Sequence, residues 1–462
     1  MEEHESAIKC NSQNEFNITT LLHRMESWKQ NLSNHSAENF MPTLFGRGIF
    51  DFFPHLASVN LTDLAPVMLT PTIQRWKRLV FGIPVVMRNT NYIEETLASL
   101  FKHLTPSASD QVLFVVMFAT PNTNTAAFKK LSYSLISNYA NEIEEGLLEV
   151  AVIPSKWYES QPAFITPTFN DSSQRMQWRL KQNLDYFYLM NYGRQKAEYY
   201  MQLEDDVATT PKYAQTVLNY LQLKEGRPWF SMHFSTLGFI GKLFRSEDVK
   251  IITNAILSYY KYKPVDWIFL DVEYSITCSP EYRKEQCIRA RDASRVMVSP
   301  PQFQHIGKLS SLGGKKQKLK ERFFDKSSQK MTRSNPPAKV TSSMPTYYPY
   351  TAELGYQKFA FMWFTKASTG DNVTIEFHNP VKVLGVQMIS GINPAPLDMF
   401  AHDTKLYAQG LDKREQLLGS FSSYGDIVVR MNGTAMTALI LRIFSNHTRW
   451  VIVGHMEIDY EN

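Results

Sequence analysis

Cysteine is scarce in this chain, and long apolar runs are missing altogether. The 462 residues include three cysteines and no CxxC pair, which argues against a structural zinc site. No stretch of 18 or more apolar residues occurs, and the opening residues, MEEHESAIKCNSQNEF, contain neither the basic nor the apolar part of a secretory signal. The sequence therefore predicts no transmembrane segment in this chain.

An excess of one charge is missing as well. The 49 basic and 44 acidic residues leave a net charge of +5, which is too balanced for a protein that coats nucleic acid. A hydrophobic fraction of 44% is sufficient for a sizeable core, so the chain is predicted to be globular. Local basic clusters still suit a small anionic ligand, and no nucleic-acid partner is expected.

One sequence feature favours an oxidising compartment, and a disulfide would be expected in such a compartment. The chain has eight Asn-x-Ser/Thr matches, which accept N-glycans in secreted proteins but also occur in cytosolic ones. Cys278 and Cys287 are close together in TCSPEYRKEQC, and an oxidising compartment would favour a short disulfide loop between them. The matches begin at Asn17, Asn31, Asn34, Asn60, Asn170, Asn372, Asn432 and Asn446.

Apolar runs alternate with helical patterns from residue 81 onward. Between the first runs, residues 92–104 and 128–146 repeat apolar side chains at a spacing of three and four, which is typical of helices. This alternation predicts an α/β domain with a mostly parallel sheet, whose ligands lie at the carboxyl ends of the strands. The runs occupy 81–86, 112–119, 147–153, 199–204 and 229–235.

The texture of the sequence divides the chain into three predicted segments. Residues 1–78 are polar and are expected to form a stem or leader, and residues 79–330 are expected to form the α/β domain. A lysine-rich, glycine-containing tract around 310–340 marks a boundary. After it, residues 335–462 contain short runs separated by Gly, Pro and Asn, which predict a β-sandwich.

Three acids end the apolar run YYMQLEDD. Glu204, Asp205 and Asp206 repel one another unless a positive group shares them. A solvated turn is one interpretation of such a triplet. Because the run ends inside an α/β domain, the second interpretation is a site for a divalent cation, and Mg²⁺ or Mn²⁺ would suit a site that also holds a phosphate.

Several long motifs resemble those of the N-acetylglucosaminyltransferase IV family, glycosyltransferase family 54. They are TFNDSSQRMQWRLKQNLDYFYLMNYGRQKAEYYMQLEDDV, STLGFIGKLF, KPVDWIF and PQFQHIGKLSSLGGKKQKL, and they occur in family order. The resemblance implies a GT-A fold followed by a lectin-like β-sandwich. It further implies metal-dependent, inverting transfer of N-acetylglucosamine from UDP-GlcNAc to the 4-hydroxyl of the α1,3-arm mannose of N-glycans, in the Golgi.

The resemblance assigns the acids and one histidine to the donor site. Asp206 is expected to bind the metal, with Mn²⁺ as the preferred ion, and Glu204 and Asp205 to lie near the ribose and the metal's waters. His305, in FQHIG, matches a position where GT-A enzymes place a second metal ligand. A structural histidine bound within an apolar segment is the alternative.

Basic residues near these motifs are expected to bind the donor. Arg88 follows the first strand, whereas Arg175, Arg179 and Lys181 lie on a predicted helix that the family places near the donor. Their spacing does not put all three on one helical face. A lysine cluster after His305 either neutralises the leaving diphosphate or forms a solvated face. It comprises Lys308, Lys315, Lys316 and Lys318.

The catalytic base is expected to be Asp266 or Asp271. The family pattern resembles DWLLDHI, whereas this chain has DWIFLDV, so the second acid is displaced by one residue, or about 100° around a helix. Residues 120–122 are TPN where the family has acids, and Met87 replaces a basic residue. A catalytically inactive paralogue that binds glycans or regulates other Golgi N-acetylglucosaminyltransferases is therefore the alternative function.

Two residues of the C-terminal segment are expected to contact glycans. Asp398, in PAPLDMF, matches a loop acid that the family uses to bind terminal N-acetylglucosamine, although it also suits a plain turn. Trp450 opens an apolar strand and is predicted to be either a core residue or a platform for a sugar ring.

Overall fold

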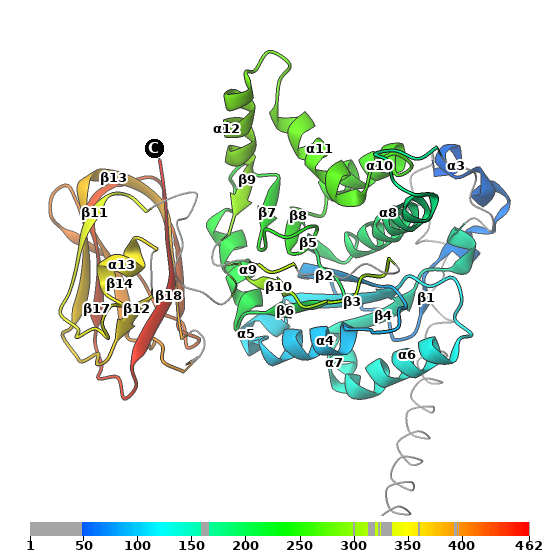
Figure 1. Cartoon of the computed structure of the whole chain (residues 1–462). Helices are drawn as coiled ribbons and strands as arrows, with labels where there is room; N and C mark the ends of the chain where they lie inside the picture. The colour runs from blue at the N-terminus through cyan, green and yellow to red at the C-terminus, as the bar shows by residue number, and fades with distance from the viewer. Residues whose placement is uncertain are drawn as a thin grey trace, which may run out of the picture.

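A mixed α/β domain is followed by a strand-rich C-terminal domain in the computed structural model of the chain (Figure 1). The broad fold class expected from the sequence is thereby confirmed. The structure describes residues 49–158, 166–298, 301–312, 319–321, 324, 335–358, 361–391, 395 and 397–461.

The central sheet has eight strands in the order β1-β4-β3-β2-β5-β8-β7-β9. Strand β2 pairs in parallel with both β3 and β5, and β3 pairs in parallel with β4, so the predicted parallel sheet is confirmed for these four strands. Strand β8 is antiparallel to β5 and β7, which the sequence pattern did not indicate. The bounds are β1 Val67–Met68, β2 Lys77–Val85, β3 Val112–Phe118, β4 Leu148–Val152, β5 Ala197–Gln202, β7 Ser231–His233, β8 Lys242–Arg245 and β9 Arg295–Met297.

Helices cover both faces of this sheet, which explains why its inner strands are apolar throughout. Alternate residues of β2 enter different cores: Phe81 packs with α4, α6 and α9, and Val80 packs with α8, α10 and α11. The helices of this domain are α3 Ile49–Phe52, α4 Ile93–Lys102, α5 Pro106–Ser109, α6 Ala126–Asn138, α7 Ala140–Glu144, α8 Ser173–Gly193, α9 Tyr213–Leu223, α10 Val249–Tyr259, α11 Val265–Thr277 and α12 Lys284–Ser294. Its short 3₁₀ turns are η2 Pro54–Ser58, η3 Leu61–Leu64 and η4 Ser155–Trp157.

The described part of the predicted stem packs on the α/β domain instead of standing apart from it. Phe53 and Leu56 are buried, and the ring of Phe53 lies 5.2 Å from that of Trp157. These apolar side chains are removed from water only by contact with the domain, so residues 49–78 are corrected to part of its packing. The remainder of the predicted stem lies outside the described residues.

The C-terminal domain is built around one long strand, β13. Its first half pairs with β11 and β17, and its second half pairs with β16 and β18, so the sheets on either side share this strand. Their apolar side chains enclose a separate core. The bounds are β11 Ala338–Ser342, α13 Ala352–Tyr356, β12 Met362–Phe364, β13 Asn372–Ser390, β14 Thr404–Gly410, β15 Glu415–Ser420, β16 Asp426–Arg430, β17 Ala435–Ile443 and β18 Val451–Tyr460.

Helix α9 of the α/β domain packs against β13 and β16 of the C-terminal domain (Figure 1). Asn219 donates to Asp426 at 2.7 Å, and Lys224 forms a 2.8 Å ion pair with Asp459. These polar groups are largely buried and are paired across the interface, which avoids the cost of burying them alone.

Among the described residues, no helix has the length and apolar character needed to cross a membrane.

Candidate active site

The acid triplet stands at the carboxyl end of β5, in the segment that leads into β6 (Val207–Thr209). Strand β10 (Phe303–His305) pairs antiparallel with β6, and its register sets His305 opposite Val207. The amide of Ile306 donates to the carbonyl oxygen of Asp206 at 2.8 Å, which extends the pairing by one step. This register brings His305 to the acids, although the two segments are far apart in the sequence.

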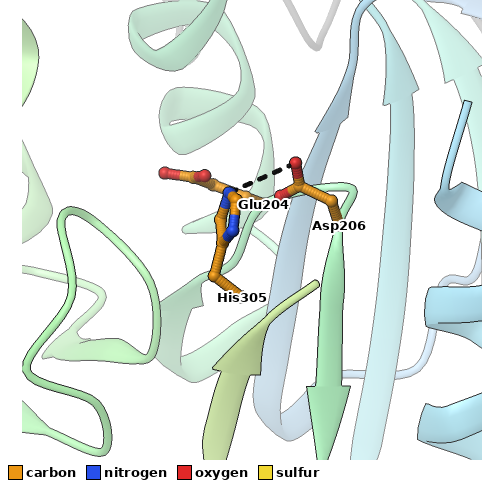
Figure 2. Close-up of side chains that lie close together, drawn as sticks. All are labelled: Glu204, Asp206 and His305. Carbon is orange, nitrogen blue, oxygen red and sulfur yellow. Dashed lines mark ion pairs between the residues drawn. The ribbon is translucent and has the colours of Figure 1, made fainter. Parts of the chain in front are cut away.

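Glu204, Asp206 and His305 form a group that is suited to holding a metal ion. One ligand atom from each residue lies within 4.8 Å of the others, and no other such group occurs within the part of the chain that the structure describes. His305 Nε2 lies 3.4 Å from Asp206 Oδ2. Figure 2 shows the His305 ring between the two carboxylates, with the dashed line marking its contact to Asp206.

Arg88 provides the positive charge nearest to the triplet. Its Nη2 atom lies 2.5 Å from Asp205 Oδ1 and 3.2 Å from Asp206 Oδ2. The guanidinium also lies over the ring of Tyr92, 5.0 Å from the centroid. Since Arg88 follows β2, and β2 pairs with β5, the sheet itself brings this cation to the acids.

Gly307 leaves the space that the Asp206 carboxylate occupies. A Cβ atom at position 307 would lie 2.1 Å from Asp206 Oδ2, well inside van der Waals contact. The sequence interpretation missed this residue, although it is the glycine of the FQHIG motif. Close approach of another group is a usual reason for a glycine next to a site.

Burial raises the pKa values of Glu204 and Asp205. Burial, together with the charge of Asp206, raises the pKa of Glu204 to about 8. Burial raises the pKa of Asp205 to about 7, with the Arg88 charge opposing it. Burial is the largest single influence on the pKa of His305 and lowers it, but the hydrogen bond to Asp206 and the charges of Asp206 and Glu204 together leave this pKa above its ordinary value.

The residues present fit a divalent cation. Asp206 Oδ1, Asp205 Oδ2 and His305 Nδ1 are buried without a hydrogen-bond partner among the described residues. Buried polar atoms are normally bonded, so unpaired carboxylate oxygens in a buried group call for a positive partner. Carboxylate oxygens with one imidazole suit Mn²⁺ or Mg²⁺ among the common divalent ions.

Helix α8 carries the other predicted donor-binding residues. Ser172 caps it by accepting the amide of Arg175 at 3.3 Å. Arg175 and Arg179 both form ion pairs with Asp171, at 3.0 and 2.7 Å, and the structure does not bring them to the acids. Lys181 donates to Asp185 at 2.7 Å and to the carbonyl oxygen of Ala119, at the end of β3.

The predicted lysine cluster is only partly within the described residues. Lys308 is exposed, and its amide donates to the hydroxyl of Tyr92 at 3.2 Å. Lys315, Lys316 and Lys318 lie outside the described residues.

The two candidate bases lie on α11 with different surroundings. Asp266 is half-buried in the first turn of the helix. Asp271 is exposed and forms a 2.5 Å ion pair with Lys263, so its carboxylate is held at the surface. Glu273, which the sequence interpretation missed, anchors the helix: it is buried and accepts from Ser231 at 2.5 Å and from Arg295.

The residues at which the sequence departs from the family pattern lie just after β2 and β3. Met87 is half-buried against the apolar core, and Arg88 alone faces the acids there. Thr120 is buried just after β3, whereas residues 121 and 122 are exposed.

The predicted glycan contacts of the C-terminal domain lie close to each other. Trp450 is 43% exposed and stacks on Tyr347, with ring centroids 5.8 Å apart, so it is not a core residue. The carbonyl oxygen of Asp398 accepts the amide of Ile452 at 2.9 Å, which sets the Asp398 turn beside the start of β18. No described contact of the Asp398 carboxylate distinguishes a ligand-binding role from a turn role.

Cys278 and Cys287 are joined by a disulfide between α11 and α12, with their Cα atoms 4.7 Å apart. It closes the loop at the end of the α11–α12 hairpin.

Comparison with known proteins gives one family and a set of curated relatives. Residues 47–324 match the model of the MGAT4 conserved region. The human protein named alpha-1,3-mannosyl-glycoprotein 4-beta-N-acetylglucosaminyltransferase B is 34% identical over 78% of this chain and 64% of its own length. The zebrafish protein of the same name and the mouse protein named as form A are each 32% identical over 89% of this chain and 79% of their own lengths. The chain thus spans slightly less than two thirds of the human relative.

Solved structures of carbohydrate-binding domains match about a quarter of this chain and nearly the whole of their own length. A family 32 carbohydrate-binding module in complex with galactose covers 27% of this chain at 8% identity, with a TM-score of 0.23. A lectinolysin lectin domain in complex with Lewis B antigen covers 28% at 8% identity, with a TM-score of 0.22. Likenesses at this level carry no argument about the ligand.

Proposed function

This chain belongs to the MGAT4 family, and on that premise we propose that it is a metal-dependent glycosyltransferase. Its proposed reaction is the inverting transfer of N-acetylglucosamine from UDP-GlcNAc to the 4-hydroxyl of the α1,3-arm mannose of an N-glycan, within the Golgi. The observation that carries the proposal is the group of Glu204, Asp206 and His305 at the carboxyl end of β5. This position is where α/β sheets bind nucleotide ligands, and it is the basis for proposing a GT-A-like fold.

The side chains around this group suggest a division of labour. Asp206 and His305 would bind the cation, and Glu204 would bind either the cation itself or its water ligands. Arg88 keeps Asp205 and Asp206 in place. When bound there, a divalent cation supplies charge neutralisation for the diphosphate leaving group. Asp266 accepts the proton of the attacking hydroxyl, because it is half-buried in the first turn of α11, whereas Asp271 lies exposed at the surface beside Lys263.

A transfer assay tests this proposal. Purified protein is incubated with UDP-GlcNAc, Mn²⁺ and a biantennary N-glycan, with the mouse relative as the positive control and Asp206→Asn as the matched inactive variant. We expect a product of one added N-acetylglucosamine that depends on Mn²⁺ and on Asp206. Absence of product while the relative is active would contradict the proposal.

The surface ion pair of Asp271 favours one alternative function. If the displaced acid of the DWIFLDV motif is the residue that the reaction needs, the chain is a catalytically silent protein that binds glycans or regulates Golgi N-acetylglucosaminyltransferases. Calorimetric titration with UDP and Mn²⁺ separates the two functions. An eroded donor site predicts no metal-dependent binding of UDP, and measurable turnover would remove this alternative.

A further inference from the structure

Two exposed aromatic side chains meet beside the N-terminal end of α11. Phe169, in the loop before α8, is 54% exposed, and Trp267, in the first turn of α11, is 46% exposed. Their ring centroids lie 5.1 Å apart with an interplanar angle of 71°. Apolar rings held together in water, instead of in the core, mark a surface that a ligand or partner covers.

The backbone that presents Phe169 is strained. Phe169 and Asn170 have φ values of 58° and 57°, so two successive residues adopt the left-handed conformation. Asparagine tolerates this region, but a bulky residue such as phenylalanine rarely adopts it. Such a conformation persists only where surrounding contacts impose it, and it is concentrated at functional sites.

Arg179 imposes this conformation. The side chain is buried, and its guanidinium donates to Thr168 Oγ1 at 2.6 Å, to Asp171 Oδ2 at 2.7 Å and to the carbonyl oxygen of Tyr262 at 3.0 Å. Thr168 Oγ1 donates to the same carbonyl at 2.8 Å. The loop is therefore tied on both sides of Phe169 and is bound to the segment that leads into α11.

The same arginine also contacts the aromatic ring. The Arg179 guanidinium lies 5.7 Å from the centroid of Phe169, which fixes the ring as well as its backbone. Trp267 directly follows Asp266, the base of the proposed reaction, in the first turn of α11. A ligand on the two rings would therefore lie near the turn that carries the base.

We propose that Phe169 and Trp267 form an aromatic platform that binds a sugar ring of the acceptor glycan. This inference rests on the proposed function, because it takes the ligand to be an N-glycan. A pyranose ring has an apolar face of C–H groups, which packs on the negative face of an aromatic ring, while its hydroxyls remain available to neighbouring polar groups. Arg179 is thereby a positioning residue for the platform.

Fluorine NMR tests the platform without requiring turnover. Protein labelled with 5-fluorotryptophan is titrated with the biantennary N-glycan in a Trp450→Ala background, which reduces binding by the C-terminal domain. The Trp267 signal is assigned by its loss in Trp267→Phe. Because Asn170 begins an Asn-x-Ser match, the protein is produced without glycosylation. Tyr282→Ala serves as the control, since Tyr282 is 47% exposed at the far end of the α11–α12 hairpin.

The expected result is a Trp267 shift that saturates with the glycan, and an apparent Kd that rises about tenfold or more in Phe169→Ala and Trp267→Ala. Trp267→Phe should retain most of the affinity, and Tyr282→Ala all of it. An unmoved Trp267 signal, or equal losses in Phe169→Ala and Tyr282→Ala, would overturn the proposal. So would a change in oligomer size in these variants without loss of glycan binding, since the surface would then be a protein interface.

The two proposals fail in different ways. If the glycan moves the Trp267 signal but no transfer occurs, the platform stands and the transferase function falls. If transfer occurs and the acceptor KM is unchanged in Trp267→Ala, the function stands and the platform falls.

Discussion

Gly307 and Asp206 are in such close contact that a single methyl group could not be placed between them. The Cβ of any residue at 307 would lie 2.1 Å from Asp206 Oδ2 and 2.8 Å from its Cγ. The strand after the acids and the strand before Gly307 are paired, so neither backbone is free to withdraw.

Gly307→Ala is therefore expected to displace the Asp206 carboxylate. The Mn²⁺ dissociation constant should rise by at least about tenfold, corresponding to about 1.4 kcal/mol. Calorimetric titration with Mn²⁺ measures it. Gly419→Ala is the matched control, because a Cβ there meets its nearest atom at an ordinary 3.4 Å. Equal Mn²⁺ affinity in the two variants would show that Asp206 is not a ligand.

Metal binding should also be visible in thermal stability. Mn²⁺ at a concentration 100 times its Kd stabilises a protein that binds it only when folded by about 2.7 kcal/mol. We expect this gain in the natural chain and its loss in Asp206→Asn, with Tm measured by calorimetry with and without Mn²⁺ or EDTA. Asp271→Asn removes an exposed acid instead and should retain the gain. A stabilisation of Asp206→Asn equal to that of the natural chain would count against the site.

Arg88→Met is expected to destabilise the metal-free protein. Without the guanidinium, Asp205 loses its ion-pair partner and Asp206 keeps only its contact with His305, and loss of one partner of a buried ion pair costs about 3 kcal/mol. Urea unfolding in the presence of EDTA measures the loss. Arg414→Met is the control, since the Arg414 side chain is 90% exposed beside Asp412 and its loss should cost less than about 0.5 kcal/mol. Similar losses in the two variants would contradict the importance of the Arg88 contacts.

Acidification should weaken the interface between the domains. His455 Nε2 lies 3.0 Å from the Tyr220 hydroxyl of α9, and burial lowers its pKa to about 4 despite the opposing charge of Glu457. Lys358, which pairs with Glu457, acts in the same direction as burial. The folded state therefore binds fewer protons than the unfolded state between the two pKa values. The contribution of His455 to the free energy of unfolding is fully present above about pH 6.5. It falls by about 1.4 kcal/mol per pH unit as the pH decreases towards 4.

Urea unfolding between pH 5 and pH 7 measures this slope. His233 also has a lowered pKa, of about 4, and will contribute a second proton. His455→Phe keeps a ring at the interface but removes one titrating group. The pH dependence of its free energy of unfolding should therefore correspond to the uptake of one proton fewer. An unchanged pH dependence in this variant would show that His455 does not take up a proton on unfolding in this pH range.

Local patterns in the sequence were sufficient for the parallel strands of the central sheet and for the change to a strand-rich C-terminal domain. The apolar runs at 81–86, 112–119, 147–153 and 199–204 overlap β2, β3, β4 and β5, because fully buried parallel strands must be apolar on both faces. The triplet at 204–206 indicated a site for the same reason: three adjacent acids after a buried strand require a compensating charge. The family resemblance rested on motifs of this local kind.

Contacts between distant segments were not predictable in the same way. Arg179 was expected near the donor because the family resemblance places its helix there, but Asp171 and the Tyr262 carbonyl bind it beside the loop that presents Phe169. Trp450 opens an apolar strand, but only the packing of Tyr347 beside it shows that the ring lies at the surface.

The stretch YYMQLEDD by itself indicates a charged site at the end of a buried strand, because the apolar run and the three acids are adjacent in the sequence. The groups that compensate this charge are determined by the fold. Strand pairing brings Arg88 from β2 and His305 from β10, and the close approach of two backbones leaves room for Asp206 only because residue 307 is glycine. Register and packing connect segments that have no relation along the chain, and they are decided by the whole of the core.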